Sequence, residues 1–348
     1  MDLESARALW EPEPGWLNTA SYGLPTTPAY DAVLAAQRDW RVGRTSWEPW
    51  GEVGEHARAL FADLVGADAS DISIGAAVSG MLAPVGASLT PGTRVVVPDI
   101  EFTSNVFPWM VHEARGVEVV CVPFAKLAEA VDERTDVVAY SLVQSADGTL
   151  AADAEIVAAA RAHGALVVVD ATQAVGWLPV DATRYDVMAV GGYKWLMNPR
   201  GTGYTYYAPG VRDRFVPVAA GWYAGEDVHA SYYGPPLRLA TDARRFDTSP
   251  AWFAWVGAAP ALEVVRDIGI EQIHAHNVAL ANRFLTALGR PEGDSAIVTV
   301  DVPGADEALR AAGVKAAVRA GRVRASFHLY TTTDDVDLAV NALLAQGG

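Results

Sequence analysis

The chain has 348 residues, of which 51% are hydrophobic and 20% are charged, a composition that is ordinary for a globular protein of two domains. Its formal net charge of −16 disfavours nucleic acid as a partner, because phosphate binding needs clustered lysine and arginine. No apolar run reaches the roughly 18 residues of a membrane span, and residues 1–15 lack a signal-peptide pattern, so we expect a cytoplasmic protein without membrane contact.

Apolar strands alternate with helices through the first part of the chain. Most of the apolar runs are continuous, as expected for parallel strands that are covered on both faces. Between them lie helical stretches such as 154–164, which ends on a glycine. The runs that predict strands are 93–100, 117–124, 136–143, 165–170 and 186–191. This alternation predicts an α/β fold with a mostly parallel sheet.

The pattern changes near Pro250. Residues 252–289 predict one long helix, and short strands are predicted at 296–302 and 322–328. We therefore expect the chain to have three parts. These are an N-terminal segment at 1–15, a large domain at 16–245 and a small C-terminal domain at 246–348.

Two of the predicted core strands give way to polar residues. One stops at Asp170, with Gln173 shortly after it, and the other leads through two glycines to Tyr193 and Lys194. Ligands bind beyond the carboxyl ends of the strands in open parallel sheets, so these side chains are expected to share one crevice. The alternative is a buried ion pair that only closes the end of the sheet, because structural pairs also occur there.

A lysine and an aspartate in one crevice suit the cofactor pyridoxal 5′-phosphate (PLP). The lysine amine forms a Schiff base with the aldehyde of the cofactor. The carboxylate keeps the ring nitrogen protonated, so that the ring can withdraw electrons. A glutamine three residues after the aspartate can donate to the phenolic oxygen, and a tyrosine hydroxyl beside the lysine can bind the phosphate.

Four motifs carry a resemblance to a known family. They are D-A-T-Q at 170–173 with K-W-L-x-x-P-R-G-T-G from Lys194, WLNTASYGLP at 16–25, PDIEFTSNVFPW at 98–109 and RVRASFHLYTTTDDVD at 322–337. By their sequences and their order along the chain, they resemble the fold-type I, class V aminotransferase family. This family includes cysteine desulfurases, kynureninases and isopenicillin N epimerase-like proteins. The resemblance implies a large PLP-binding domain, with a mostly parallel seven-stranded sheet between helices, and a smaller α+β C-terminal domain.

The resemblance also implies roles for the residues at the strand ends. Lys194 carries the cofactor and moves protons at the substrate Cα, and Asp170 binds the pyridinium nitrogen. Gln173 donates to the phenolic oxygen, and Tyr193 binds the phosphate. The hydroxyl that relatives carry two positions before this tyrosine is replaced by Gly191, so one phosphate contact is missing.

Residues 73–84 resemble the phosphate-binding turn of the family, which opens a helix. Free backbone N–H groups and the helix dipole favour an anion at such a terminus. The threonine of relatives is absent, which leaves Val78 and Ser79 as the candidate phosphate contacts. The alternative is a serine that only caps the helix.

The resemblance assigns further residues to the two ligands. Arg324 matches the arginine that binds the substrate α-carboxylate, for which a planar guanidinium is suited, although an exposed arginine on a strand is the simpler interpretation. Asn105 and Trp222 are assigned to the substrate, and a core position is equally compatible with the tryptophan. The expected partner is a small-molecule amino-acid substrate.

Other residues are assigned to the cofactor. Phe102 is our choice for the group that stacks on the ring, and Thr103, which aligns with the histidine of desulfurases, is the alternative. Ser145 aligns with an asparagine that touches cofactor and substrate. Ser249 aligns with a threonine that reaches the phosphate of the neighbouring subunit, so the resemblance implies a homodimer with shared active sites.

The sequence indicates the reaction less clearly than it indicates the cofactor. Residues 313–324 lack the nucleophilic cysteine of desulfurases, and the single cysteine, Cys121, is expected to be a small buried hydrophobe in a strand. No spacing of histidines predicts a metal site. An aminotransferase acting on an L-α-amino acid is our preferred hypothesis. The alternatives are a lyase that cleaves a C–S or C–C bond without a cysteine, an epimerase-like enzyme, and a non-catalytic protein of the same fold.

Overall fold

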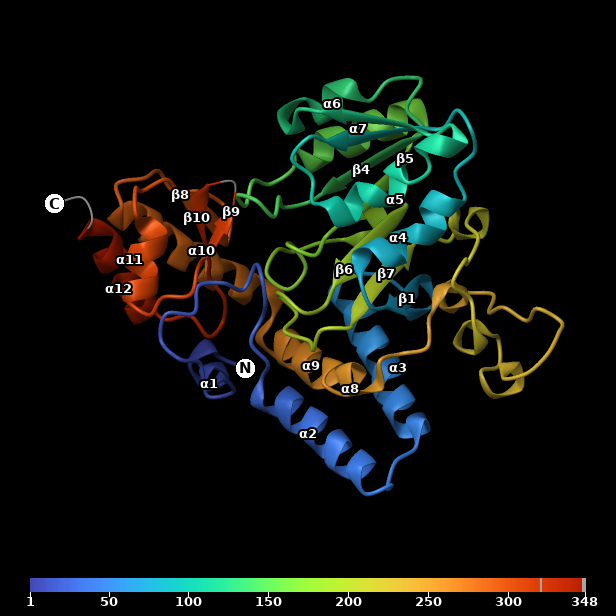
Figure 1. The fold of residues 1–348 in the computed structure, drawn as a ribbon, viewed down its shortest axis with the longest axis horizontal. Helices are drawn as coiled ribbons and strands as arrows, with labels where there is room; N and C mark the ends of the chain where they lie inside the picture. Colours follow the sequence, from blue (N-terminus) through green and yellow to red (C-terminus); the bar gives the residue numbers. More distant parts are fainter. Residues whose placement is uncertain (320, 346–348) are drawn as a thin grey trace.

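The computed structural model describes residues 1–319 and 321–345. A seven-stranded sheet forms the centre of the larger domain, and a three-stranded sheet lies in a smaller domain beside it (Figure 1). The strands of the large sheet are β1 (Ile72–Gly75), β2 (Arg94–Pro98), β3 (Glu118–Val122), β4 (Val137–Ser141), β5 (Leu166–Asp170), β6 (Val187–Gly191) and β7 (Gly203–Tyr207). Their order is β1-β7-β6-β5-β4-β2-β3, and only β7 runs antiparallel to its neighbours. The prediction of a mostly parallel sheet is therefore confirmed.

The large sheet is covered by helices on both faces. Side chains of β5 alternate between the two cores, since Val167 and Val169 belong to one hydrophobic cluster and Val168 to the other. This explains the continuous apolar run in the sequence. The helices of this part of the chain are α1 (Leu3–Arg7), α2 (Thr27–Arg41), α3 (Trp47–Leu64), α4 (Val78–Ala87), α5 (Phe107–Met110), α6 (Leu127–Ala130) and α7 (Asp153–His163).

The small domain contains the antiparallel strands β8 (Ile297–Val300), β9 (Ala317–Arg319) and β10 (Arg322–Ser326), with β10 in the middle. Its core joins apolar side chains of this sheet, such as Val298 and Val323, to those of the neighbouring helices, such as Phe284. The helices after the large sheet are α8 (Trp252–Trp255), α9 (Ala258–Ile268), α10 (Ile270–Ala287), α11 (Ala305–Ala311) and α12 (Thr333–Leu344).

Two predictions about these elements are wrong. The long helix expected at 252–289 is divided into α8, α9 and α10, and α9 ends before Gly269, whose φ of +90° an L-residue in a helix does not adopt. Cys121 is exposed rather than buried, because β3 is the edge strand of the sheet. In addition, α9 contributes Leu262 and Val265 to the core of the large domain.

An N-terminal strap, defined as residues 15–23, runs between the two domains. Trp16 and Asn18 form parallel bridges to Lys315 and Ser326 of the small domain, and Leu17 lies in the core of that domain. The strap passes between the small domain and the loops at the ends of the large sheet (Figure 1). Within the described ranges, no helix has the length and apolar character needed to cross a membrane.

Candidate active site

The ends of β5 and β6 bring the two charged residues of the sequence prediction to one edge of the sheet. Asp170 is the last residue of β5, and Lys194 follows the end of β6 by three residues. Both side chains are buried, with relative exposures of 5% for the aspartate and 7% for the lysine. No ion-pair contact joins them in the structure, although each charge shifts the pKa of the other group.

Thr172 connects the ends of the two strands, and the sequence analysis missed it. Its backbone N–H donates to Asp170 Oδ1 at 2.9 Å, and its hydroxyl accepts from the N–H of Gly191 at 2.9 Å. Burial raises the pKa of Asp170, while the hydrogen bonds from Thr172 and the charge of Lys194 lower it. A buried carboxylate in this position is stabilised by a cationic partner.

Gln173 is fixed by four hydrogen bonds from different parts of the chain. Its Oε1 accepts from Trp195 Nε1 at 2.9 Å, and its backbone carbonyl accepts from Trp177 Nε1 at 2.6 Å. Its Nε2 donates to the carbonyl of Ala20 and to Ser145 Oγ, both at 3.0 Å. The amide therefore has a defined orientation and joins the strap to the end of β5.

Lys194 is a buried amine with aromatic neighbours. Its Nζ lies 5.6 Å from the ring centroid of Phe102 and 5.8 Å from that of Tyr193. Burial lowers the pKa of Lys194 to about 8, in opposition to the carboxylate of Asp170, which raises it. An amine with this pKa has a substantial neutral fraction near neutral pH, which a nucleophile or a proton acceptor needs.

The strap passes unusually close to the backbone at Lys194. The N–H of Gly23 donates to the carbonyl of Tyr193 at 3.0 Å. A Cβ at Gly23 would lie 1.9 Å from the carbonyl oxygen of Lys194, so this position accepts only glycine. This close packing explains why the WLNTASYGLP motif has a glycine at position 23.

Arg324, on β10, reaches this region from the small domain. Its Nη1 donates to the carbonyl and the hydroxyl of Ser145, and its Nη2 donates to Ser21 Oγ at 2.8 Å. The side chain is 1% exposed and has no carboxylate partner among residues 1–319 and 321–345. Burial lowers the pKa of Arg324 to about 10, and the charge of Arg319 lowers it further. Such a group favours an anionic ligand, because a buried charge needs a counter-charge.

Glu101 is a second residue that the sequence analysis did not assign. It is buried, and its carboxylate accepts hydrogen bonds from the N–H groups of Phe102 and Ser141, from the Ser141 hydroxyl and from Gln144 Nε2. Burial raises its pKa, and the charge of Asp170 adds to this effect. These bonds hold Phe102 at the end of β2 and fix the loop that leads to Ser145.

The predicted phosphate turn lies at the start of α4. Ala77 is the N-cap and makes no side-chain capping bond, so neighbouring N–H groups at this terminus point outward. Ser79 is exposed there, whereas Val78 is buried. Tyr193 is half-buried, with the guanidinium of Arg200 4.6 Å above its ring.

Four other predicted site residues occupy different surroundings. Thr103 and Ser249 are exposed. Asn105 is fully buried, and its amide has no hydrogen-bond partner in the described structure. Trp222 packs at 5.0 Å against Trp47 in an aromatic cluster, and its role at the substrate stays a prediction.

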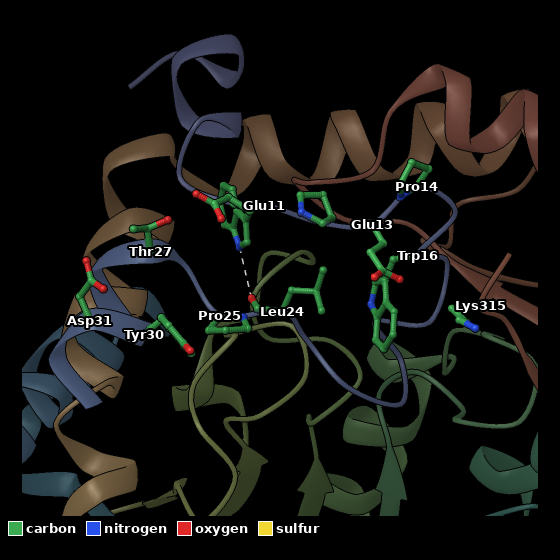
Figure 2. A pocket seen from close by; sticks show the side chains of 12 residues that line it. Glu11, Glu13, Pro14, Trp16, Leu24, Pro25, Thr27, Tyr30, Asp31 and Lys315 are labelled. Atoms are coloured by element: carbon green, nitrogen blue, oxygen red, sulfur yellow. Dashed lines mark hydrogen bonds between the residues drawn. The ribbon is translucent and has the colours of Figure 1, made fainter. Parts of the chain in front are cut away.

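A cleft of about 580 Å³ lies on the other side of the strap (Figure 2). Trp16 and Lys315 line one end of it, and Thr27, Tyr30 and Asp31 line the other. Trp10 also lines the cleft, and its Nε1 donates to the carbonyl of Leu24 at 3.2 Å. None of the residues around Lys194 lines this cleft, so it is separate from the candidate active site.

Comparison with known proteins decides the family. A family model described as "Aminotransferase class-V" matches residues 48–303, which is more than half of the chain. The chain therefore belongs to the class V aminotransferase family. Enzymes of this family depend on PLP, and the predictions of the family, the cofactor and an enzyme are confirmed.

Relatives of this class V chain carry several activities in their names. It is 27% identical to the "Uncharacterized aminotransferase YcbU" of Bacillus subtilis, over 87% of this chain and 86% of that protein. It is 28% identical to the isopenicillin N epimerase of Streptomyces clavuligerus, over 100% of this chain and 99% of that protein. A probable cysteine desulfurase of Methanothermobacter thermautotrophicus is 27% identical over 71% of each chain.

Solved structures show the same fold. The cysteine desulfurase CsdA of Escherichia coli superposes with a TM-score of 0.84 at 21% identity, covering 99% of this chain and 98% of that one. The cystine C–S lyase C-DES, in a mutant with glycine linked to PLP, superposes with a TM-score of 0.87 at 20% identity and covers 99% of both chains. At these identities the likeness establishes the fold, not the reaction.

The side chains of this class V enzyme fit the cofactor. Asp170 is a buried carboxylate that needs a cationic partner, and Lys194 is a buried amine that no carboxylate contacts directly. The N-terminus of α4 has unused N–H groups of the kind that bind phosphate. These residues offer a group that suits the ring nitrogen, a group that suits the aldehyde and a helix terminus that suits the phosphate.

Proposed function

We propose that this class V enzyme is an aminotransferase that acts on an L-α-amino acid. The observation that carries the proposal is that the site has two buried cations of different kinds. Lys194 is an amine whose pKa is lowered to about 8, and Arg324 is a guanidinium with hydroxyl and carbonyl partners but no acidic one in the described structure. The first suits proton transfer and the second suits a carboxylate.

Each residue has a separate task in this proposal. Asp170 holds a proton on the ring nitrogen of PLP, and Gln173 orients its phenolic oxygen. Tyr193 and the start of α4, with Ser79, bind the phosphate, and Phe102 covers one face of the ring. When bound, PLP withdraws electrons from the substrate Cα, which makes the proton there acidic.

Lys194 is the group that moves this proton. With cofactor and substrate bound, the amine of Lys194 would be the group that accepts the Cα proton. Because its pKa is about 8, it can accept a proton and return it at another carbon near neutral pH. Return of the proton to the opposite face of Cα would give epimerisation, whereas aminotransfer would require Lys194 to deliver it away from Cα.

The cysteine content supports aminotransfer over persulfide chemistry. Cys121 is the only cysteine in the sequence, and it lies on β3, which is separated from β5 by β2 and β4. A desulfurase needs a cysteine thiolate at the substrate, and the segment before Arg324 contains none. The full-length likeness to isopenicillin N epimerase favours epimerisation as the second candidate.

We also propose a homodimer and a cytoplasmic location. Apolar side chains flank α4 and are exposed in the single chain, which favours an interface at this surface. They are Phe107, Met110, Val111, Val216 and Val218. Ser249 is exposed as well, and a second copy gives it a phosphate to bind.

Incubation of the purified, PLP-loaded protein with single L-amino acids tests the reaction. Aminotransfer converts the bound cofactor to its amine form, with loss of the yellow absorbance and release of a keto acid. Racemisation of the amino acid with retained absorbance would support the epimerase instead, and cleavage of the amino acid at Cβ with retained absorbance would support a lyase. Lys194→Ala is the control, and it should remove both the covalent cofactor and the conversion.

A further inference from the structure

Three arginines lie on one face of the small sheet, next to the candidate active site. In the antiparallel pair of β9 and β10, Arg319 lies opposite Arg322, and Ala317 lies opposite Arg324. Alternate residues of a strand share a face, so Arg319, Arg322 and Arg324 point to the same side. Arg324 donates to Ser145 of the large domain, which shows that this face is turned toward the active site.

The three arginines differ in how their charges are balanced. Arg322 lies 3.9 Å from the carboxylate of Asp147. Arg319 and Arg324 have no acidic partner in the part of the chain that the structure describes, and both reach the same hydroxyl. Arg324 Nη2 is 2.8 Å from Ser21 Oγ, and Arg319 Nη2 is 3.5 Å from it. Two uncompensated guanidinium groups therefore converge on one point beside Lys194.

The proposed function uses only one of these charges, since a single α-carboxylate satisfies Arg324. A second anionic group on the same ligand would satisfy Arg319, and guanidinium groups bind carboxylates well through paired N–H donors. The charges of Arg324 and Arg319 both lower the pKa of Lys194, which is consistent with their convergence on the site. A ligand with two carboxylates would remove both of these repulsive effects.

We propose that Arg319 is a specificity-determining residue that binds a side-chain carboxylate, so that the preferred substrates are dicarboxylic L-amino acids. The inference rests on the proposed function, because it assumes that Arg324 binds the α-carboxylate. Arg324 then fixes one end of the substrate and Arg319 the other. Ser21 holds both guanidinium groups in place.

Binding titrations of matched amino acids test the inference. The PLP-loaded protein is titrated with L-glutamate and with L-glutamine, which has nearly the same shape, and the change in cofactor absorbance gives each Kd. We expect the acid to bind about five-fold more tightly, a modest factor because Arg319 is exposed and its charge is screened. L-Aspartate and L-asparagine form a second pair.

Two variants complete the experiment. Arg319→Gln should abolish the preference for the acid and leave the Kd of glutamine unchanged. Arg310→Gln, which removes an exposed arginine on α11 that pairs with Asp306, should keep the preference. Equal binding of acid and amide by the wild type, or an unchanged preference in Arg319→Gln, overturns the inference alone. A protein that binds neither member of either pair also overturns the inference, and only a protein that binds no L-amino acid at all overturns the proposed function together with it.

Discussion

Two buried arginines of this enzyme have opposite surroundings. Arg58 on α3 is 2% exposed and contacts the carboxylates of Asp247 at 2.6 Å and Glu55 at 2.9 Å. Arg324 on β10 is 1% exposed and contacts only hydroxyls and a carbonyl. Despite burial, the nearby carboxylates raise the pKa of Arg58, whereas burial lowers the pKa of Arg324 to about 10. Two arginines that are equally buried therefore differ in whether the chain supplies a counter-charge.

The difference separates a structural charge from a binding charge. Asp247 also accepts from the N–H of Ile74 at 2.8 Å, so the Arg58 pair ties α3 and residue 247 to the edge strand β1. The chain neutralises this arginine itself. Arg324 has no such partner in the described structure, and in the proposed function the substrate carboxylate neutralises it.

The largest expected effect is on stability. Arg58→Met leaves Asp247 buried without its partner and should lower the free energy of unfolding by about 3–5 kcal/mol. Arg324→Met removes a buried charge that has no counter-charge and should change it by less than about 1 kcal/mol. Chemical denaturation of the cofactor-free protein measures both. Equal losses in the two variants would remove the distinction between the arginines.

Substrate binding should show the reverse order. Arg324→Lys keeps the charge but loses the paired N–H donors, so the Kd of amino-acid substrates should rise by about one to two orders of magnitude. The absorbance of the bound cofactor should not change, because the arginine is assigned to the substrate. If this variant binds amino acids as tightly as the wild type, the α-carboxylate is bound elsewhere.

The lowered pKa of Lys194 predicts how covalent binding of the cofactor depends on pH. Below pH 8 the amine is mostly protonated, and its neutral fraction rises about tenfold for each pH unit. The rate of covalent PLP uptake by the cofactor-free protein should therefore rise with pH and level off above about pH 8. A free lysine, whose pKa is 10.5, should continue to gain reactivity in parallel measurements. A rate that keeps rising past pH 9 in the protein would mean that Lys194 is an ordinary exposed amine.

The smallest effect concerns the hydroxyl between the two active-site arginines. Ser21→Ala removes one hydrogen bond to Arg324, a loss of about 1 kcal/mol, and should weaken amino-acid binding about five-fold. Ser70→Ala, at an exposed serine before β1, is the control and should have no effect. An unchanged Kd in Ser21→Ala would show that Arg324 is held by Ser145 alone.

Much of this molecule was predictable because its central strands are long, apolar and end in polar residues. β2 to β6 follow the continuous apolar runs, and Asp170 and Lys194 lie together because parallel strands end at the same edge. β1 and β7 were missed because the first has only four residues and the second, GYTYY, is rich in polar hydroxyls. Their pairing, not their composition, makes them strands.

The contacts that complete the site were beyond a sequence argument. Ser21, Thr172 and Glu101 act through hydrogen bonds whose partners depend on how distant segments meet. A resemblance to a family assigns residues that occupy motif positions, and it is silent on Arg319, which lies outside the motifs. Ser21, two residues before Gly23 in WLNTASYGLP, is the one local signal that was present.

The strap has a consequence for how the chain acquires its function during synthesis. All seven strands of the large sheet have been made once Tyr207 has left the ribosome. The hydrogen bond between Ser21 and Arg324 joins residues that are 303 positions apart, so it cannot form until almost the whole chain has emerged. A domain can fold before the rest of its chain is made, whereas contacts of such large sequence separation form late. The cofactor crevice can therefore exist on a nascent chain well before that chain is able to hold a substrate.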